Sequence, residues 1–278
     1  MAVLFVSSCG DQYNELNLRK QLVNGRGDKI RFLYDACDRI SVYTTPEGAV
    51  SFDYDDNGNI VRTRDKQGSI TRTFDALNRV TSCIDTYGKT VGYEYDEVGD
   101  LRRITYPDNT AVSYEYDKNH NLVKVTDWAG RTTSYTYDEN NRVIGVVKPN
   151  GTVVTTVYEQ NKVKSTVEKT VSGTVISGFE YLYDNLSRIT EEKVLANSTK
   201  VCYTYDELNR VVSRTVRKLS DNSVISTENF TYDHAGNMTD ATGHCFAYGS
   251  NNKLTAFDGQ GVSYDADGNM TFGNNTYD

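Results

Sequence analysis

Short segments in which apolar and polar residues alternate run along most of this chain. Two examples are RVTSCIDT (79–86) and TVGYEYD (90–96), which are rich in Val, Ile, Thr and Tyr. Alternation with a period of two, in residues that favour extended backbone, predicts half-buried β-strands. No segment has a helical period of adequate length, and no linker composition separates the segments. The pattern therefore predicts an all-β chain.

The strands belong to an internal repeat, which is marked by an aromatic residue and usually an Asp directly after it. We call this aromatic residue the signature aromatic. It recurs every 20 or 21 residues at Tyr34, Tyr54, Phe74, Tyr95, Tyr116, Tyr137 and Tyr158, and Tyr13 lies in the same register. The later steps are first longer (Tyr183, Tyr205, Tyr232) and then shorter (Tyr248, Tyr264, Tyr277). Such a period predicts repeated supersecondary units that are stable only when stacked.

Each repeat also carries two turn signals. In the first, which we call the YD turn, Asp follows the signature aromatic, a Gly or Asn usually stands four residues after the aromatic, and a basic or amide residue comes next. Asp can accept backbone N–H groups two residues on, and Gly and Asn tolerate positive φ. The second signal lies fourteen residues after the aromatic, and all three prolines stand two residues before it. Each repeat thus predicts strand, turn, strand, turn, in antiparallel hairpins.

This repeat organises almost the entire chain. We interpret residues 1–12 as a lead-in for which a strand is one reading, and residues 13–278 as a YD-repeat β domain. Its regular units span 13–157, its longer units 158–231 and its shortened units 232–278. The change in length predicts a strip that narrows toward a closing end. The alternative fold is a β-propeller, in which two repeats would make one four-stranded blade. Odd and even repeats carry the same marks, which favours a continuous spiralling strip.

The composition indicates that tyrosine has to supply much of the buried apolar area. The chain has 278 residues, is 37% hydrophobic and contains 21 Tyr. We expect successive Tyr rings to pack on one another as a ladder. The net charge of −8 disfavours nucleic acid as a partner, and no apolar run is long enough to span a membrane. The five cysteines lack any C-x-x-C spacing, so we expect small buried residues and not a zinc site.

The start of the chain, MAVLFVSSCG, resembles a lipoprotein cleavage box that ends at Cys9. The basic region of a signal is missing and the apolar run is short, so no convincing signal peptide is present. We favour a β-strand or a start inside a longer gene. Whether Cys9 is lipidated is left open.

The phrases YDELNRV, YDHAGNM and YDADGNM, repeated in register with a Gly turn between them, resemble the YD repeats of RHS proteins. Relatives in this family include bacterial polymorphic toxins, wall-associated surface proteins, the C components of insecticidal toxin complexes and teneurin ectodomains. The resemblance covers roughly residues 13–278. It implies a long antiparallel β-strip that coils into a hollow shell, which in the toxins encloses a C-terminal effector domain.

The sequence also departs from the toxins of the family. They carry a core segment with an aspartate-based self-cleavage site and then a toxin, whereas this chain ends in mid-repeat at GNNTYD. Neither activity is therefore carried over, and we expect a partial shell that lacks the core and the toxin tail. The residues carried over are structural. They are Tyr54, Asp55, Gly58, Tyr95, Asp96, Gly99, Tyr116, Asp117, Tyr137, Asp138, Tyr183, Asp184, Tyr205, Asp206, Tyr232, Asp233, Gly236, Tyr264, Asp265 and Gly268.

No catalytic, cofactor or metal site is predicted. Asp53, Asp55 and Asn57 have the spacing of a calcium loop, but the twelfth position is Arg64 where Glu is needed. His120 and His234 stand in turn positions, and no hydrolase, zinc-protease or phosphate-loop motif is present. The only Trp, Trp128, precedes a Gly turn and is the best single candidate for a ligand contact.

The sequence thus predicts a non-enzymatic structural scaffold, a segment of an RHS/YD-repeat shell without cofactors. The alternative is a carbohydrate- or cell-surface-binding repeat module, because exposed aromatic rings can also stack on sugars. The expected partners are the remainder of a larger shell or an enclosed toxin domain. A glycan and self-association through open sheet edges are further expectations. As part of a larger protein, the chain is expected to be secreted or on the cell surface.

Overall fold

The computed structural model describes residues 11–265 and 268–271. Cys9, nearly all of the expected lead-in and the last signature residue, Tyr277, lie outside the described residues. The chain divides into two compact units, one comprising residues up to Ser113 and from Ser263 onward, the other Tyr114–Val262. The described parts of both units consist of antiparallel hairpins. The one helical element among the described residues is the short 3-10 turn η1 (Leu195–Asn197), in the second unit.

The first unit contains one long antiparallel ladder and one separate hairpin. From β1 to β11 consecutive strands pair with one another, and β26 pairs only with β27. The strands are β1 (Gln12–Tyr13), β2 (Arg19–Val23), β3 (Lys29–Tyr34), β4 (Ile40–Thr45), β5 (Gly48–Tyr54), β6 (Ile60–Asp65), β7 (Gly68–Phe74), β8 (Val80–Ile84), β9 (Thr90–Tyr95), β10 (Leu101–Thr105), β11 (Ala111–Tyr116), β26 (Ser263–Tyr264) and β27 (Met270–Thr271).

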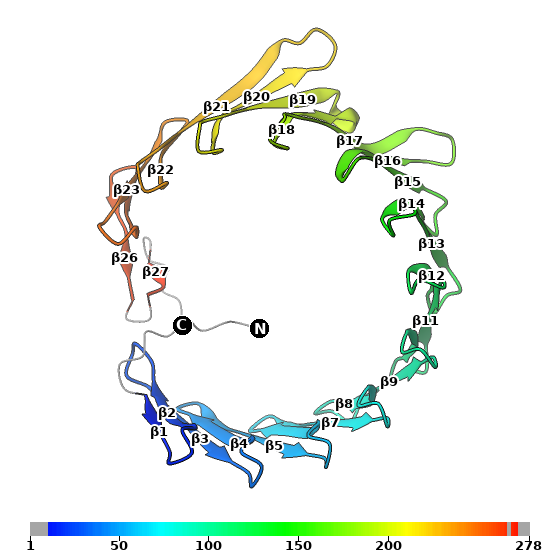
Figure 1. Cartoon of the computed structure of the whole chain (residues 1–278), viewed down its shortest axis with the longest axis vertical. Helices are drawn as coiled ribbons and strands as arrows, with labels where there is room; N and C mark the ends of the chain where they lie inside the picture. Colours follow the sequence, from blue (N-terminus) through cyan, green and yellow to red (C-terminus); the bar gives the residue numbers. More distant parts are fainter. Residues whose placement is uncertain (1–10, 266–267, 272–278) are drawn as a thin grey trace. The chain divides into compact units, whose positions relative to one another are not determined.

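The second unit continues in the same way from β12 to β25, each strand pairing with the next (Figure 1). Its strands are β12 (Leu122–Thr126), β13 (Thr132–Tyr137), β14 (Val143–Val147), β15 (Val153–Glu159), β16 (Lys162–Lys169), β17 (Val175–Tyr183), β18 (Ile189–Val194), β19 (Thr199–Tyr205), β20 (Val211–Lys218), β21 (Val224–Tyr232), β22 (Met238–Ala241), β23 (His244–Tyr248), β24 (Leu254–Phe257) and β25 (Gln260–Gly261).

These ladders confirm the predicted all-β fold, an antiparallel strip of hairpins. A propeller would divide the strands into separate four-stranded blades. Here the pairing runs on across every boundary between repeats inside each unit, so the propeller alternative is wrong. Strand length follows repeat length: β17 and β21 have nine residues, whereas β22 and β24 have four. The narrowing toward a closing end stays a prediction.

A β-bulge accompanies the signature aromatic, a feature that alternation alone did not predict. Leu33 pairs with Val42, yet the next residue, Tyr34, pairs with Ile40, so one residue of β4 is left over. The same shift occurs at Tyr54, Phe74, Tyr95, Tyr137, Tyr158, Tyr183, Tyr205 and Tyr232. A bulge bends its strand and increases the local twist, so each of these repeats adds a bend at the same place.

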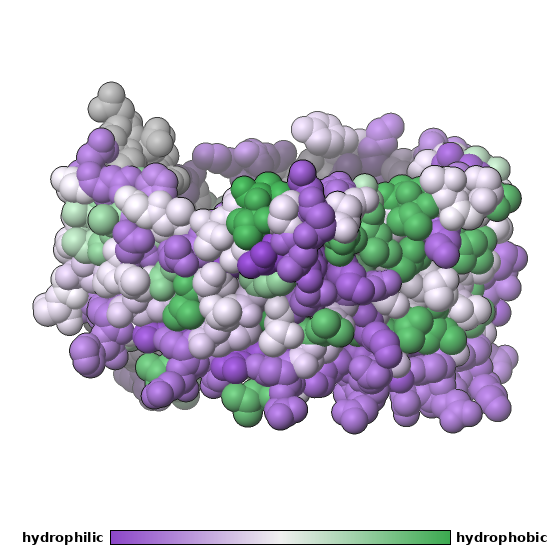
Figure 2. Space-filling view, turned by 90° about the horizontal axis from the view of Figure 1, so that it is seen from above, coloured by the Kyte–Doolittle hydropathy of each residue, from purple (hydrophilic) through white to green (hydrophobic). Residues whose placement is uncertain are grey.

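The core of this strip is thin. Among the described residues the buried apolar side chains are Leu22, Val112 and Val201, and none of the large side chains is fully buried. On the face that Figure 2 presents, apolar residues form separate patches among polar ones. Among the described residues the signature tyrosines are half-buried except Tyr13, which is 51% exposed, so burial is distributed over many repeats.

The expectation of buried cysteines is wrong for the described residues. Cys37 and Cys245 are exposed, and Cys83 and Cys202 are half-buried. Cys37 stands in a YD turn, at the edge of the strip, and a strip with so thin a core offers few deeply buried positions for the other thiols.

Candidate functional site

The YD turn is built around its Asp carboxylate. In the turn after Tyr205, Asp206 Oδ1 accepts the backbone N–H groups of Leu208 and Arg210, each at 2.9 Å. The carbonyl of Asp206 accepts the N–H of Asn209, which has a φ of 65°. Positive φ is tolerated by Asn and Gly with little strain, which explains why these residues recur there. The same carboxylate bonds form at Asp35, Asp55, Asp75, Asp96, Asp117, Asp138 and Asp184.

These bonds change the acidity of the Asp side chains. The pKa of Asp206 is lowered, first by the backbone N–H of Arg210 and then by its guanidinium, against the opposing effect of burial. For Asp138 the order differs, since the side chain of Arg142 is the largest cause of its lowered pKa and the Arg142 backbone N–H comes second. Both carboxylates are therefore held ionised at neutral pH as turn acceptors.

The signature tyrosine hydroxyl joins one repeat to the one before it. Tyr205 donates to the carbonyl oxygen of Ile189 at 2.6 Å, and Ile189 opens the strand that follows the preceding YD turn. The same bond recurs between Tyr34 and Arg19, Tyr54 and Ile40, Tyr95 and Val80, Tyr137 and Leu122, Tyr158 and Val143, Tyr183 and Val163, and Tyr232 and Val211. The hydroxyl, and not only the ring, is thus a structural element of the repeat. Sequence reasoning had assigned no partner to it.

An arginine supplies the second link between repeats. Arg210 stands five residues after Tyr205, and its Nε donates to Asp206 Oδ2 at 2.7 Å. Its guanidinium carbon lies 4.5 Å from the centre of the Tyr232 ring, and its Nη1 donates to the carbonyl of Asp233 at 3.2 Å. Cations lie over the next ring in the same way for Arg39 and Tyr54, Arg79 and Tyr95, Arg142 and Tyr158, and Arg188 and Tyr205.

The expected packing of Tyr rings on neighbouring rings and side chains takes two forms. Along β17, Phe179 and Tyr181 stack with ring centres 6.4 Å apart, and Tyr181 and Tyr183 lie 6.4 Å apart with their planes tilted by 41°. Elsewhere the ring of a signature Tyr typically faces a cation of the preceding repeat. A guanidinium reaches the next ring from the turn that precedes the one intervening strand. The rings of successive repeats are separated by that strand and stand about 10 Å apart, twice the spacing between neighbouring strands.

Some repeats carry Asn at the fifth position, which we call the Arg slot. Asn121 Nδ2 donates to Asp117 Oδ2 at 3.0 Å and to Asn141 Oδ1 at 2.8 Å. Asn59 and Asn237 make equivalent pairs of bonds, to the Asp of their own turn and to Asn78 and Asn252. The amide therefore makes the bond to its own Asp that Arg makes, but its second bond goes to an Asn side chain of the next turn, and it is too short to cover the next ring.

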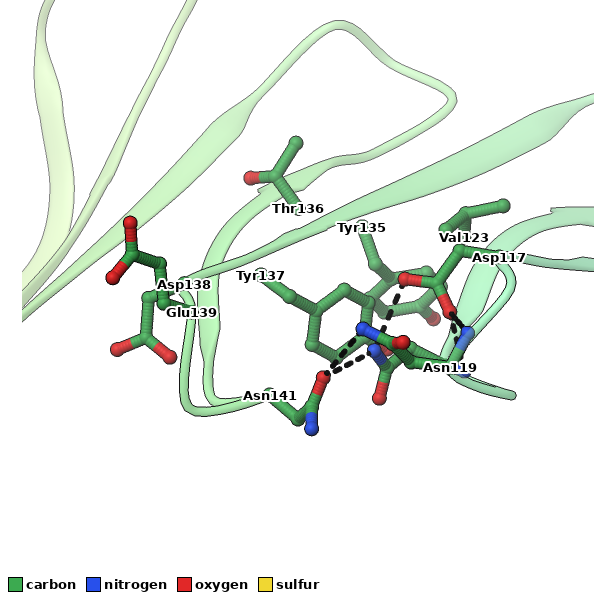
Figure 3. A pocket seen from close by; sticks show the side chains of 10 residues that line it. Asp117, Asn119, Val123, Tyr135, Thr136, Tyr137, Asp138, Glu139 and Asn141 are labelled. Carbon is green, nitrogen blue, oxygen red and sulfur yellow. Dashed lines mark hydrogen bonds between the residues drawn. The ribbon is translucent and has the colours of Figure 1, made fainter.

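A pocket of about 440 Å³ lies beside Asn121, in the second unit (Figure 3). It is lined by Asp117, Asn119, Asn121, Val123, Tyr135, Thr136, Tyr137, Asp138, Glu139 and Asn141. Asn119 Nδ2 and Asn121 Nδ2 both donate to Asn141 Oδ1, and Figure 3 shows Asn119 and Asn141 next to the ring of Tyr137. The lining combines aromatic rings, amides and carboxylates, and it contains no Lys or Arg.

The remaining candidate residues lie apart from one another. Trp128 is 61% exposed, in the turn between β12 and β13. His120 occupies the positive-φ position of its YD turn, with a φ of 63°. Both carboxylate oxygens of Asp55 accept bonds from Asn57 and Asn59, so the calcium-like spacing is used by a turn. Asp265 makes the same bonds to Asn269, and Gly268 has a φ of 84°.

The strip, its YD turns and the links between repeats define a YD-repeat shell protein. A family model described as Teneurin YD-shell matches residues 14–169 and 150–278. The chain belongs to this family. In the described part of the chain, no helix is long and apolar enough to cross a membrane.

Solved structures share the fold. A crystal structure of TcdB2–TccC3 without its hypervariable C-terminal region matches with a TM-score of 0.71 and 16% identity, over 94% of this chain. A structure of the Photorhabdus luminescens Tc holotoxin pore matches with a TM-score of 0.57 and 14% identity, also over 94% of this chain. This chain spans 18% of the length of each of those chains. No curated protein matches.

Proposed function

We propose that this chain is a non-enzymatic structural scaffold, one segment of a larger RHS/YD-repeat shell. The observation that carries the proposal is the pair of links between successive repeats. The Tyr hydroxyl bond and the Arg contact both join one repeat to the next. The recurring Asp, Arg and Tyr side chains therefore hold successive repeats together. This is the role expected of residues in a structural shell.

The comparisons support the same proposal. The family is named for a shell, and the solved relatives are about five times longer than this chain. We therefore infer that the partner is the remainder of a larger shell or a toxin domain enclosed by it. By analogy with the toxins of the family, the larger protein is secreted or displayed on the cell surface.

Protection from protease tests the shell. The gene product that contains this chain together with its downstream sequence is expressed, and a protease site is placed in the segment after residue 278. The expected result is that this site is cut slowly in the native protein and rapidly after mild denaturation. A site inside a hollow shell is screened, whereas cleavage at the same rate in both states would reject an enclosing role.

The open edges of the β-sheet lead to a second testable expectation, self-association of the chain. A sheet edge presents unpaired backbone groups that can pair with another chain. The 278-residue chain alone is therefore expected to self-associate as its concentration rises, when followed by light scattering. A strictly monomeric chain at high concentration would contradict this part of the proposal.

The second candidate function, a glycan- or surface-binding module, rests on Trp128. A Trp ring that is 61% exposed at the tip of a hairpin can stack on a sugar face. A glycan array with the wild-type chain and Trp128→Ala tests it, with Tyr87→Ala as a matched control because Tyr87 is 86% exposed in the equivalent turn. Binding lost only in Trp128→Ala would support the module. The absence of any glycan signal would reject it.

A further inference from the structure

The pocket beside Tyr137 differs from the repeats that carry an arginine in what covers the signature ring. In five repeats an arginine from the preceding repeat lies over that ring, with the guanidinium carbon 4.2–4.6 Å from the ring centre. The residue in the Arg slot before Tyr137 is Asn121. Among the described residues, no arginine or lysine occupies the corresponding place over Tyr137.

The polar groups that hold the arginine elsewhere are nevertheless kept. In the repeat of Arg210, the Nη1 atom donates to the carbonyl of Asp233, the residue after the next signature Tyr. The equivalent residue here is Asp138, which lines the pocket and whose carbonyl accepts the N–H of Asn141. In the Arg210 repeat the Asp233 carbonyl accepts an equivalent turn bond from Gly236 in addition to the arginine. A second donor can therefore be accepted at Asp138.

The electrostatics of the pocket also favour a cation. Its lining residues include three acidic ones, Asp117, Asp138 and Glu139, and no Lys or Arg. Figure 3 shows the Asp138 and Glu139 carboxylates turned away from the Tyr137 ring, and Arg142 Nε donates to Asp138 at 2.7 Å. The exposed Glu139 therefore adds negative charge near the pocket without a direct contact. An aromatic face beside carboxylates attracts a planar, weakly hydrated cation more than a neutral group.

We propose that this pocket binds a guanidinium group supplied from outside the repeat, as the arginine side chain of another polypeptide. The incoming group lies over the ring of Tyr137 and donates to the Asp138 carbonyl. Five arginines of this chain provide the geometric template for the contact with the ring, and three of them, Arg39, Arg79 and Arg210, also for the bond to the carbonyl. Asn121 already donates to Asp117 Oδ2, so the incoming group lacks one bond that a resident arginine makes. A single side chain should thus bind weakly, with a Kd on the order of millimolar.

The test is an NMR titration of the whole chain, with labelled tyrosine rings, by N-acetyl-arginine amide. The resonances of Tyr137 are identified by their loss in Tyr137→Phe. Saturable shifts of Tyr137 are expected, with binding at least threefold weaker for N-acetyl-lysine amide and weakened by added salt. Methyl glucoside serves as the neutral probe. Shifts with the glucoside but not with the arginine analogue would identify a saccharide pocket and overturn the proposal.

Asn121→Arg is the decisive variant, because it restores the resident arginine and fills the place over Tyr137. Binding of the arginine analogue should fall at least tenfold. Asn237→Arg makes the same substitution in the slot before Tyr248 and should leave the Tyr137 titration unchanged. If Asn121→Arg does not fold, Glu139→Gln should weaken binding at least twofold. Equal affinity in the wild type, Asn121→Arg and Glu139→Gln, or no saturable shift in the wild type, would refute the site.

Discussion

The guanidinium carbon of Arg210 lies 4.5 Å from the centre of the Tyr232 ring, although the two residues belong to successive repeats. The same arginine holds Asp206 in its own turn and the Asp233 carbonyl in the next. One side chain therefore ties the conformation of one YD turn to the position of the following turn. In a strip with little fully buried core, contacts of this kind carry much of the coupling between repeats.

Replacing Arg210 should therefore loosen the next turn as well as its own. We expect Arg210→Gln to lower the free energy of unfolding by about 1–2 kcal/mol, from the loss of a cation–π contact and charge-assisted hydrogen bonds. Arg210→Lys should recover only part of this, since an ammonium lacks the planar fork. Urea unfolding measures the loss, and hydrogen exchange at the Gly236 amide reports the next turn.

The matched control is Lys164→Gln. Lys164 pairs with Glu159 at 3.1 Å, but both side chains are more than half exposed, and such pairs contribute on the order of 0–1 kcal/mol. We expect a smaller change in unfolding free energy than for Arg210→Gln, and no change in exchange at Gly236. Equal effects of the two substitutions would mean that Arg210 is an ordinary surface charge.

The hydrogen bonds of the tyrosine hydroxyls make a second contribution to the free energy of unfolding, which can be measured separately. Tyr205→Phe keeps the ring but removes the bond to the carbonyl of Ile189, a half-buried residue. The expected loss is about 1 kcal/mol, the typical net contribution of one hydrogen bond. Thermal or urea unfolding measures it. Tyr87→Phe is the control, because the Tyr87 side chain is 86% exposed. A Tyr205→Phe chain as stable as the wild type would mean that water replaces the missing bond without cost.

One repeat uses a residue that is poorly suited to its turn. Ser187 has a φ of 68°, whereas the same position in the next repeat is Asn209, with a φ of 65°. A left-handed conformation costs an ordinary L-residue roughly 1–2 kcal/mol, and Gly avoids most of this cost. Ser187→Gly should raise the free energy of unfolding by about 1 kcal/mol, and Asn209→Ala should lower it by about the same amount. If Ser187→Gly is neutral or harmful in urea unfolding, the turn is not strained at this residue.

The features that depend on adjacent residues could be predicted from the sequence. The period, the antiparallel strands and both turn signals follow from the local pattern around residues such as Asp206 and Asn209. The bulge at the signature aromatic could not be predicted, since alternation continues through it and only the partner strand shows the extra residue. A bulge is a property of a strand pair, which a single strand does not reveal.

The contacts between repeats were missed for a related reason. The hydroxyl of Tyr205 bonds a backbone carbonyl 16 residues earlier, and every residue type carries such a carbonyl. No side-chain signal marks the acceptor. The arginine contact had a usable signal, because Arg39, Arg79, Arg142, Arg188 and Arg210 all stand five residues after a signature aromatic. The sequence showed a basic or amide residue there, but the pairing with the next ring required coordinates.

Acid should destabilise the strip through its turn carboxylates. The pKa values of Asp206 and Asp138 are lowered in the folded state by N–H groups and guanidinium groups. A carboxyl whose folded pKa lies below its unfolded value of about 3.9 stabilises the fold fully above that value. The contribution is lost as the pH falls through the folded pKa. The urea midpoint should therefore stay constant from pH 7 to pH 5 and decline below about pH 4. Dilute protein is needed near the isoelectric point of about 5.0.

Asp206→Asn separates this effect from general acid unfolding. The amide oxygen still accepts turn N–H groups but does not titrate, so the variant should be less stable at pH 7 and should lose less stability between pH 5 and pH 3. Asp53→Asn is the control, because the Asp53 side chain is 59% exposed and its nearest cation, Arg62, is 3.8 Å away. It should follow the wild-type curve. A midpoint that already declines between pH 7 and pH 5 would assign the acid sensitivity to groups other than the YD aspartates.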